Sequence, residues 1–412
     1  MTQNSPGRIV WVATAAILIP LFVLTAAGSM RLAVADYSCR RETLPGVEKA
    51  VDLEPDSAAY RARLAAMLRE SDPPASLRAL ARAVALNPWD SESWIELGLR
   101  AEAAGDRQGA ERDLLAAERV DKLYSPRWSL ANFYFRSGEL EKFWYWAKRA
   151  VEIAPDDLAP LYALCWRVTG DGELIEGKLG LANSDAEAGY LAYLTGQGRA
   201  EPMIHAARYL LARNREADVP VLLAACDRLI GDNRPRQALE IWNGLAVRQR
   251  IPYPVLQNGQ SVANSDFRTV PSPRGFDWHL PDVYGVTSSP GDGSAGLRLT
   301  FSGREPEYCD VLTAILPVAE NSNYELQYLY VTSGIAPGAG PRWHITDFHG
   351  GGTIAQGPAI SSDHETEGRL SFRTTAGLGF VRLTLAYQRA LGTTRIEGSI
   401  TLRSLRVVPV GH

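Results

Sequence analysis

Hydrophobic and polar positions follow three patterns along the chain, and each predicts a different kind of element. Residues Ile9 to Ala27 form an uncharged apolar run of 19 residues. From about Leu44 to Arg250, apolar residues recur at helical spacing, with Gly or Pro at the turns. From Ile251 onward, short runs alternate apolar with polar residues, which is typical of strands with one buried face. The chain therefore predicts a membrane-length helix, a helical domain and a β domain, in that order.

The helical part repeats with a nearly constant period. Similar segments recur along it: Val51-Asp52-Leu53-Glu54-Pro55, Val84-Ala85-Leu86-Asn87-Pro88, Val120-Asp121-Lys122 and Val151-Glu152-Ile153-Ala154-Pro155. Their spacings are 33, 34 and 33 residues. This is the period of helix-turn-helix repeats of the tetratricopeptide type, so we expect a helical solenoid over residues 36–250.

The repeat that begins near Ser91 carries the fullest motif. It contains, in order, Trp94, Leu97, Gly98, Gly105-Asp106, Ala110, Leu114 and Ala117. On these residues the segment from Ser57 to Pro155 resembles the tetratricopeptide-repeat (TPR) family, with Leu114 in place of the usual Phe. The resemblance implies stacked helix pairs and a partner-binding groove lined by first-helix residues: Glu92, Ile95, Leu99, Trp128, Asn132 and Phe135. Packing against the neighbouring hairpin would explain the same residues.

The apolar run at residues 9–27 is about long enough to cross the hydrocarbon core of a membrane. We expect a signal-anchor, with a short cytoplasmic tail and the transmembrane helix inside residues 1–35. The alternative is a cleaved signal peptide, because Ala33-Val34-Ala35 has the small-x-small form of a cleavage site. Both alternatives place the bulk of the chain outside the cytoplasm, and the signal-anchor predicts a bacterial-type, single-pass inner-membrane protein whose bulk is periplasmic or extracellular.

The β-rich part, residues 251–412, predicts about eight to ten strands and an antiparallel sandwich. Pro317 and Pro409 are expected at strand ends, because proline lacks a backbone donor. The opening Leu256-Gln257-Asn258-Gly259, the Phe276-Asp277-Trp278 segment, the Leu297 to Gly303 strand and the closing Leu402 to Val408 strand are similar to jelly-roll, carbohydrate-binding-module-like domains. The resemblance implies glycan binding, and it would also suit a structural calcium ion bound by loop oxygens.

Glycan binding needs aromatic faces for stacking and polar groups for the sugar hydroxyls. The candidate aromatic platforms are Trp278, Tyr328, Trp343 and Tyr387. Asp347 and His349 follow Trp343 at alternate positions, so a continuous strand would place all three on one face. The competing interpretation is a strand that runs into a Gly350-Gly351-Gly352 turn with polar residues at its exposed end.

Composition and charge exclude several classes of function. The net charge is −4 and the pI about 6.0, so nothing favours nucleic acid. Serine hydrolase, zinc protease and nucleotide-binding motifs are absent from the sequence, so we expect no enzyme and no catalytic metal. Cys39, Cys165, Cys226 and Cys309 form no C-x-x-C pair, and Cys165 with Cys226 is the disulfide to test against two buried thiols.

The order of parts suggests a function. We expect a non-enzymatic, membrane-anchored adaptor that binds a protein through its helical repeats and polysaccharide through its sandwich, in the assembly or export of a cell-envelope polysaccharide. The alternative is a structural or oligomerising subunit of a secreted or cell-surface assembly.

Overall fold

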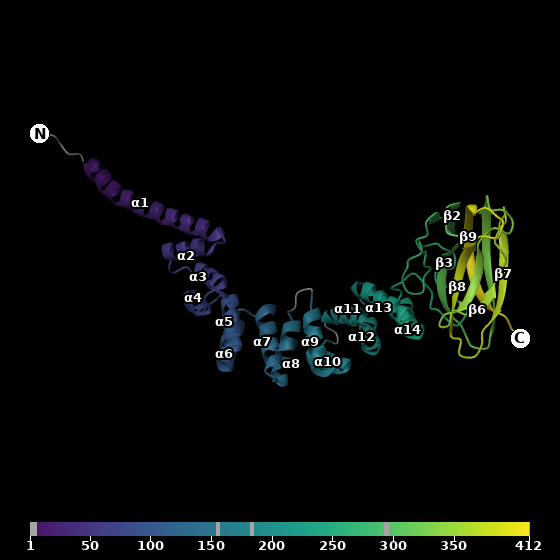
Figure 1. Ribbon diagram of the computed structural model, residues 1–412, viewed down its shortest axis with the longest axis horizontal. Helices are drawn as coiled ribbons and strands as arrows, with labels where there is room; N and C mark the ends of the chain where they lie inside the picture. Colours follow the sequence, from purple (N-terminus) through teal and green to yellow (C-terminus); the bar gives the residue numbers. More distant parts are fainter. Residues whose placement is uncertain (1–5, 154–156, 182–184, 292–295, 412) are drawn as a thin grey trace. The chain divides into compact units, whose positions relative to one another are not determined.

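The computed structural model describes residues 6–153, 157–181, 185–291 and 296–411. Helices occupy the first part of the chain and antiparallel β-sheets the last, as the sequence predicts (Figure 1). The chain forms two compact units, Met1–Leu161 and Tyr162–His412. The predicted boundary at residue 250 falls just after the last helix, and as a boundary between independent domains it stays a prediction.

Helix α1 (Pro6–Arg40) is a single helix that continues well past the apolar run at residues 9–27. Its part from Leu18 to Arg40 is long and apolar enough to cross a membrane, and a signal sequence would have the same features. Side chains such as Phe22 and Leu24 are largely exposed. Towards its end α1 contacts α2 (Leu44–Leu53), and Ala35 is fully buried there.

Three helix pairs follow α2 in the first unit, and the two helices of each pair contact one another. They are α3 (Ala58–Met67) with α4 (Pro73–Leu86), α5 (Ser91–Ala103) with α6 (Arg107–Val120), and α7 (Tyr124–Arg136) with α8 (Leu140–Val151).

Aspartates begin three of these helices. The side chains of Asp72, Asp90 and Asp106 each accept a hydrogen bond from the backbone N–H three residues later, at 3.0, 3.5 and 2.8 Å. Gly105 and Gly138 take φ values of 83° and 74° in the turns inside the pairs.

Small residues let the paired helices approach closely, as the repeat motif predicts. A Cβ added at Gly98 of α5 would lie 2.7 Å from Leu114 Cγ of α6. Ala110, Leu114 and Ala117 are completely buried. Repeated helix pairs are thereby confirmed, while Pro155, predicted to close the last repeat, lies outside the described residues.

Further helices follow α8, and the first of them begins in the last residues of the first unit. They are α9 (Ala159–Thr169), α10 (Gly172–Leu179), α11 (Ala186–Gln197), α12 (Ala200–Arg213), the short 3₁₀ helix η1 (Glu216–Asp218), α13 (Val219–Gly231) and α14 (Pro235–Val247). Helix α10 lies in a glycine-rich stretch, between Gly170 and Gly180. It forms because the Asp171 side chain caps it at 3.0 and 3.1 Å, and because Ile175 and Leu179 are buried.

Nine strands follow in the part of the chain that the structure describes. They are β1 (Val286–Pro290), β2 (Leu297–Ser302), β3 (Tyr308–Pro317), β4 (Asn323–Ser333), β5 (Arg342–Asp347), β6 (Thr353–Gln356), β7 (Thr366–Arg373), β8 (Phe380–Gln388) and β9 (Glu397–Pro409). Pro317 and Pro409 end β3 and β9, which confirms their predicted places.

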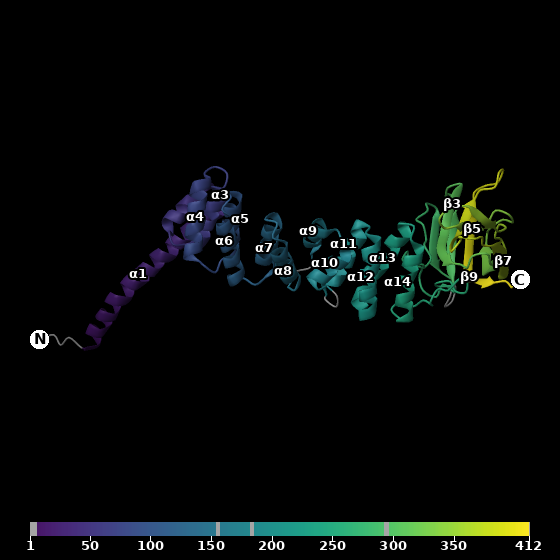
Figure 2. The ribbon, with the colours of Figure 1, turned by 90° about the horizontal axis from the view of Figure 1, so that it is seen from below.

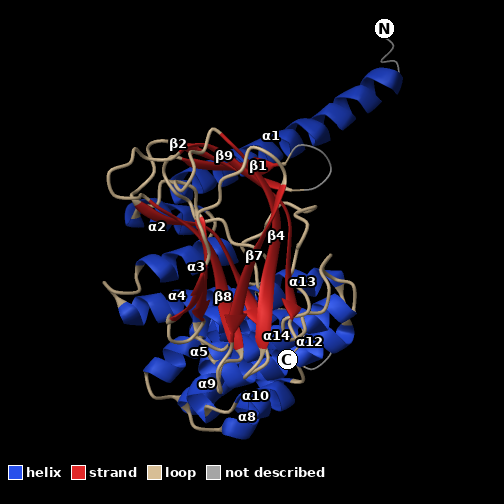
Figure 3. Ribbon diagram, turned by 90° about the vertical axis from the view of Figure 1, so that its right-hand side faces the viewer, coloured by secondary structure: helices blue, strands red, loops and turns tan. Residues whose placement is uncertain are grey.

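The strands form two antiparallel sheets that enclose one hydrophobic core (Figure 3). The five-stranded sheet has the order β1-β2-β9-β4-β7, and the four-stranded sheet has the order β3-β8-β5-β6. Along β4 buried and half-buried residues alternate over ten positions, as expected when one sheet face lies on the core.

The segment between α14 and β1 ties the last two helices to the sandwich (Figure 2). The Trp242 ring of α14 stacks on Tyr253, with ring centroids 5.3 Å apart, and meets Phe276 edge-on. Asp227 of α13 accepts a hydrogen bond from the Gly275 backbone N–H and pairs with Arg274 at 2.9 Å. These contacts hold α13 and α14 against one end of the four-stranded sheet.

Candidate functional site

The outer face of the four-stranded sheet is a polar surface built by strand alternation. Cross-strand pairing places its residues in successive rows. From one end to the other the rows are Tyr308 and Gln388; Asp310, Ala386 and Arg342; Thr313, Thr384, His344 and Gln356; and Ile315, Arg382 and Thr346. We call this surface the polar face. It offers guanidinium, imidazole, carboxylate, amide and hydroxyl groups on one rigid sheet.

Tyr308 is the exposed aromatic residue at one end of the polar face. Its side chain is 57% exposed, and its hydroxyl donates a hydrogen bond to Asp310 Oδ1 at 3.0 Å. Burial and this hydrogen bond raise the pKa of the Tyr308 phenol, so the hydroxyl stays protonated at neutral pH. An exposed ring beside polar groups is the arrangement that stacks on a sugar and hydrogen-bonds its hydroxyls.

His344 lies near the middle of the polar face, opposite Thr384 and Gln356. Partial burial lowers the pKa of its imidazole, Asp310 opposes that shift, and Arg342 adds to it. The ring is therefore neutral at pH 7, with one nitrogen that donates and one that accepts.

Helix α13 closes the end of the polar face opposite Tyr308. A cavity of about 380 Å³ lies between α13 and the sheet. Its wall includes Asp227 and Ile230 of α13, and Thr313 and Arg382 of the sheet. His279 also lines it, and its backbone exchanges two hydrogen bonds with Thr313 at 2.8 and 2.9 Å.

The four aromatic residues proposed as sugar platforms lie in the core of the sandwich. They are Trp278, Tyr328, Trp343 and Tyr387, each no more than 3% exposed. The Trp278 and Trp343 rings pack against one another with centroids 6.0 Å apart. This position corrects the expected role, because rings that fill the core have no face left for a glycan.

Asp347 and His349 also differ from the arrangement expected for them. Strand β5 ends at Asp347, whose Oδ1 accepts a hydrogen bond from the His349 backbone N–H at 2.9 Å. His349 lies in the following turn, and its Nδ1 is 2.8 Å from Asn233 Oδ1 in the α13–α14 loop. Alternation along β5 therefore extends to Asp347 but not to His349, so the expected grouping of both residues with Trp343 on one strand face is not formed.

Metal and cysteine chemistry find little support among the described residues. No group of three or more His, Cys, Asp or Glu side chains there is placed to hold a metal ion. The suggested structural calcium stays a prediction. All four cysteines are free, and Cys165 and Cys226 are buried thiols, so the suggested disulfide is not formed. Burial raises the pKa of the Cys165 and Cys226 thiols, so neither is a reactive thiolate at neutral pH.

The predicted partner groove falls on α5 and α7 of the first unit. Glu92 and Leu99 are exposed, whereas Ile95, Trp128, Asn132 and Phe135 are half-buried. Trp128 stacks on Tyr124 with centroids 6.1 Å apart, and Asn132 Nδ2 donates to the Trp128 carbonyl at 3.0 Å. The positions of these six residues fit both packing against the neighbouring hairpin and contact with a protein partner.

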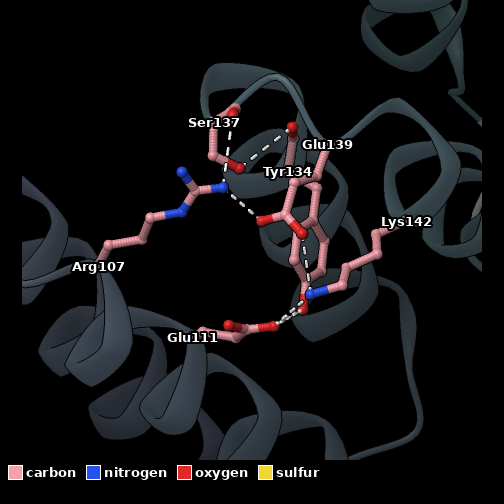
Figure 4. Close-up of polar contacts among 6 residues, drawn as sticks. All are labelled: Arg107, Glu111, Tyr134, Ser137, Glu139 and Lys142. Atoms are coloured by element: carbon pink, nitrogen blue, oxygen red, sulfur yellow. Dashed lines mark hydrogen bonds and ion pairs between the residues drawn. The ribbon is translucent and has the colours of Figure 1, made fainter.

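A charged network joins α6 to the following hairpin, and the sequence did not predict it (Figure 4). Glu111 accepts hydrogen bonds from the Tyr134 hydroxyl at 2.7 Å and from Lys142 Nζ at 2.8 Å. Lys142 also pairs with Glu139, which accepts from Arg107. These donors lower the pKa of Glu111, led by Lys142. Apart from Lys142 and Glu139, the partners lie 23 to 32 residues apart, so only the fold brings them together.

No family model and no curated protein matches this chain. Among solved structures, "CBM4 structure and function" has a TM-score of 0.29 at 11% identity, covering 36% of this chain and 100% of that chain. The structure of TmCBM61 in complex with beta-1,4-galactotriose has a TM-score of 0.27 at 11% identity, covering 37% of this chain and 99% of that chain. YrrB, a TPR protein with an unusual peptide-binding site, has a TM-score of 0.26 at 12% identity, covering 50% of this chain and 94% of that chain. The structural neighbours thus include TPR proteins and carbohydrate-binding modules, and at these scores their functions are not transferred to this chain.

Proposed function

We propose that this protein is a non-catalytic, membrane-anchored adaptor in the assembly or export of a cell-envelope polysaccharide. Helix α1 anchors it in the inner membrane, the rest of the chain lies outside the cytoplasm, the helical repeats bind a protein partner, and the polar face binds glycan. The observation that carries the glycan part is the polar face itself, with the exposed Tyr308 ring at one end and His344 near the middle.

The polar face suits a sugar chain because its groups are held by a rigid sheet and not by loops. Each row supplies hydrogen-bonding groups, and the rows repeat along the strand direction at about 3.3 Å per residue. From Tyr308 to Ile315 the face extends over roughly 20 Å, once the bulge between Asp310 and Leu312 is allowed for. A short oligosaccharide can therefore bind along it with several sugars in contact.

A glycan array tests this part with the full chain purified in detergent. We expect binding to at least one oligosaccharide, lost in Tyr308→Ala and His344→Ala. Arg406→Gln is the matched control, because Arg406 is exposed on the outer side of the five-stranded sheet opposite Gln327. Absence of binding together with a defined oligomer would favour the structural-subunit alternative.

The partner and the location need separate measurements. A photo-crosslinking residue in place of Leu99, which is exposed on α5, is expected to capture a protein partner in membranes. The same residue at Arg406 on the sandwich is the control. Alkaline phosphatase fused after residue 411 is expected to be active, because that enzyme requires an oxidising compartment. An inactive fusion of full-length protein would contradict the proposed location.

A further inference from the structure

Two arginines on the polar face have no charged partner in the part of the chain that the structure describes. Neither Arg342 nor Arg382 forms an ion pair or a hydrogen bond through its side chain there, and the Arg382 guanidinium lies over the Phe348 ring, 5.5 Å from its centroid. Arg389, which directly follows β8, is instead paired with Glu307 at 2.8 Å. Unpaired guanidinium groups on a rigid sheet favour an anionic ligand, because they offer paired donors in carboxylate geometry.

The carboxylates near Arg382 are already occupied by internal donors. Asp227 accepts from the Gly275 backbone and Arg274. Asp277 is buried and accepts from the Tyr253 hydroxyl, with Oδ2 2.7 Å away. The Ser272 and Trp278 backbone N–H groups also donate to Asp277, at 2.8 and 2.7 Å. Arg274 therefore balances the charge of Asp227, and Asp277 is held by neutral donors. Arg382 is left as the arginine at this end of the polar face without a charged partner among the described residues.

The far end of the polar face differs in charge. Asp310 accepts from Tyr308 and lies in the same row as Arg342, across Ala386. Arg342 therefore has a carboxylate in its own row, whereas the row of Arg382 holds only Ile315 and Thr346 beside it. A ligand along this face thus meets an aromatic ring at its open end and a cation at its closed end.

We propose that the polar face binds the end of an acidic polysaccharide, with a terminal uronate carboxylate on Arg382 in the cavity beneath α13. Neighbouring sugars run towards Tyr308, and His279 at the cavity wall donates to a sugar hydroxyl. This inference rests on the proposed glycan-binding function and specifies the chemical class of its ligand.

The experiment compares acidic oligosaccharides with their neutral counterparts. Full-length protein in detergent is titrated with oligogalacturonate, oligomannuronate and oligoglucuronate, and with each one after its carboxyls have been methyl-esterified. We expect one acid to bind and its ester to bind at least about tenfold more weakly, the scale of one lost charge-assisted hydrogen bond. Raising the salt concentration should weaken binding of the acid and leave binding of the ester unchanged.

Arg382→Gln and Arg406→Gln separate this site from general charge, since both substitutions remove one exposed arginine from the sandwich. We expect Arg382→Gln to lower affinity for the acid about tenfold or more and to abolish the preference over the ester. Arg406→Gln should change neither.

Three results decide the matter. Equal affinity for acid and ester would overturn the acidic-ligand inference and leave the glycan-binding function standing. Acid binding that Arg382→Gln does not weaken would overturn the placement at this cavity. If none of the six oligosaccharides binds, and the glycan array is also empty, both the inference and the proposed function fail.

Discussion

Glu187 in α11 is a carboxyl group whose environment opposes ionisation. It is completely buried, and neither carboxylate oxygen has a hydrogen-bond partner in the described part of the chain. Burial, with a smaller contribution from the Glu176 carboxylate, raises its pKa from 4.5 to about 8, and Arg213 opposes the shift. Glu176 is itself buried, with Oε2 2.7 Å from His205 Nδ1, and burial raises its pKa as well.

The raised pKa of Glu187 makes the free energy of unfolding depend on pH. Between pH 4.5 and about 8 the folded state keeps the Glu187 proton while the unfolded chain releases it. The stability that the neutral carboxyl contributes is complete below 4.5 and is lost as pH rises through 8. At about 1.4 kcal/mol per pH unit, the loss between pH 5 and pH 8 is about 3 kcal/mol. The positive end of the α11 dipole favours the carboxylate and reduces this to about 2 kcal/mol.

Glu187→Gln keeps the shape of the side chain and removes the ionisation. We expect the variant to match the wild type at pH 5 and to exceed its free energy of unfolding by about 2 kcal/mol at pH 8. Urea unfolding at both pH values, followed by circular dichroism, measures the difference. Glu173→Gln is the control, because Glu173 is exposed on α10. Its free energy of unfolding should differ from that of the wild type by the same amount at pH 5 and pH 8. An equal effect of Glu187→Gln at pH 5 and pH 8 would refute the reasoning.

Three further substitutions test the packing of the two units. Gly98→Ala should lower the free energy of unfolding by about 1–3 kcal/mol, because the added Cβ meets Leu114. Tyr134→Phe should lower it by about 1–2 kcal/mol, since Glu111 loses a partly buried hydrogen bond and keeps Lys142. Trp343→Ala should lower it by about 3–5 kcal/mol through a cavity in the sandwich core. Thermal unfolding of the purified chain measures all three.

The first two substitutions have control variants, and the third has a result that would contradict it. Gly177→Ala in α10, where nothing lies within 4 Å of an added Cβ, should stabilise the chain, and a loss there would contradict the packing argument. Tyr145→Phe removes a hydroxyl from an exposed ring and should change stability little. A Trp343→Ala variant with unchanged stability would mean that the ring does not fill the core.

Local patterns predicted the helices and strands because the hydrophobic period and the caps act over a few residues. The Gly98–Leu114 contact follows from the repeat motif, and the Asp72, Asp90 and Asp106 caps that the structure adds each act over three residues. Strand alternation likewise separates Trp343 from His344. Alternation does not show which side of the strand faces the core. The expected glycan site was placed on the side of Trp343, which is the side buried in the core.

The polar face was missed for the same reason and for one more. His344 and Arg342 could have been assigned to it from alternation along β5 alone. Tyr308 and Asp310 could not, because the bulge between Asp310 and Leu312 shifts the register of β3 against β8. The position of α13 at the end of the sheet depends on contacts such as that of Asp227 with Gly275, 48 residues apart, which no local pattern encodes.

Strand β9 lies between β2 and β4 in the five-stranded sheet, and its Ser399 accepts a hydrogen bond from Arg298, 101 residues earlier. During synthesis the helix pairs can close as soon as each second helix leaves the ribosome, since their contacts are local. The sandwich has to wait until residues 397–409 emerge, with the edges of β2 and β4 unpaired in the meantime. A chaperone that shields exposed strand edges would therefore act on this chain late, after the helices are already compact.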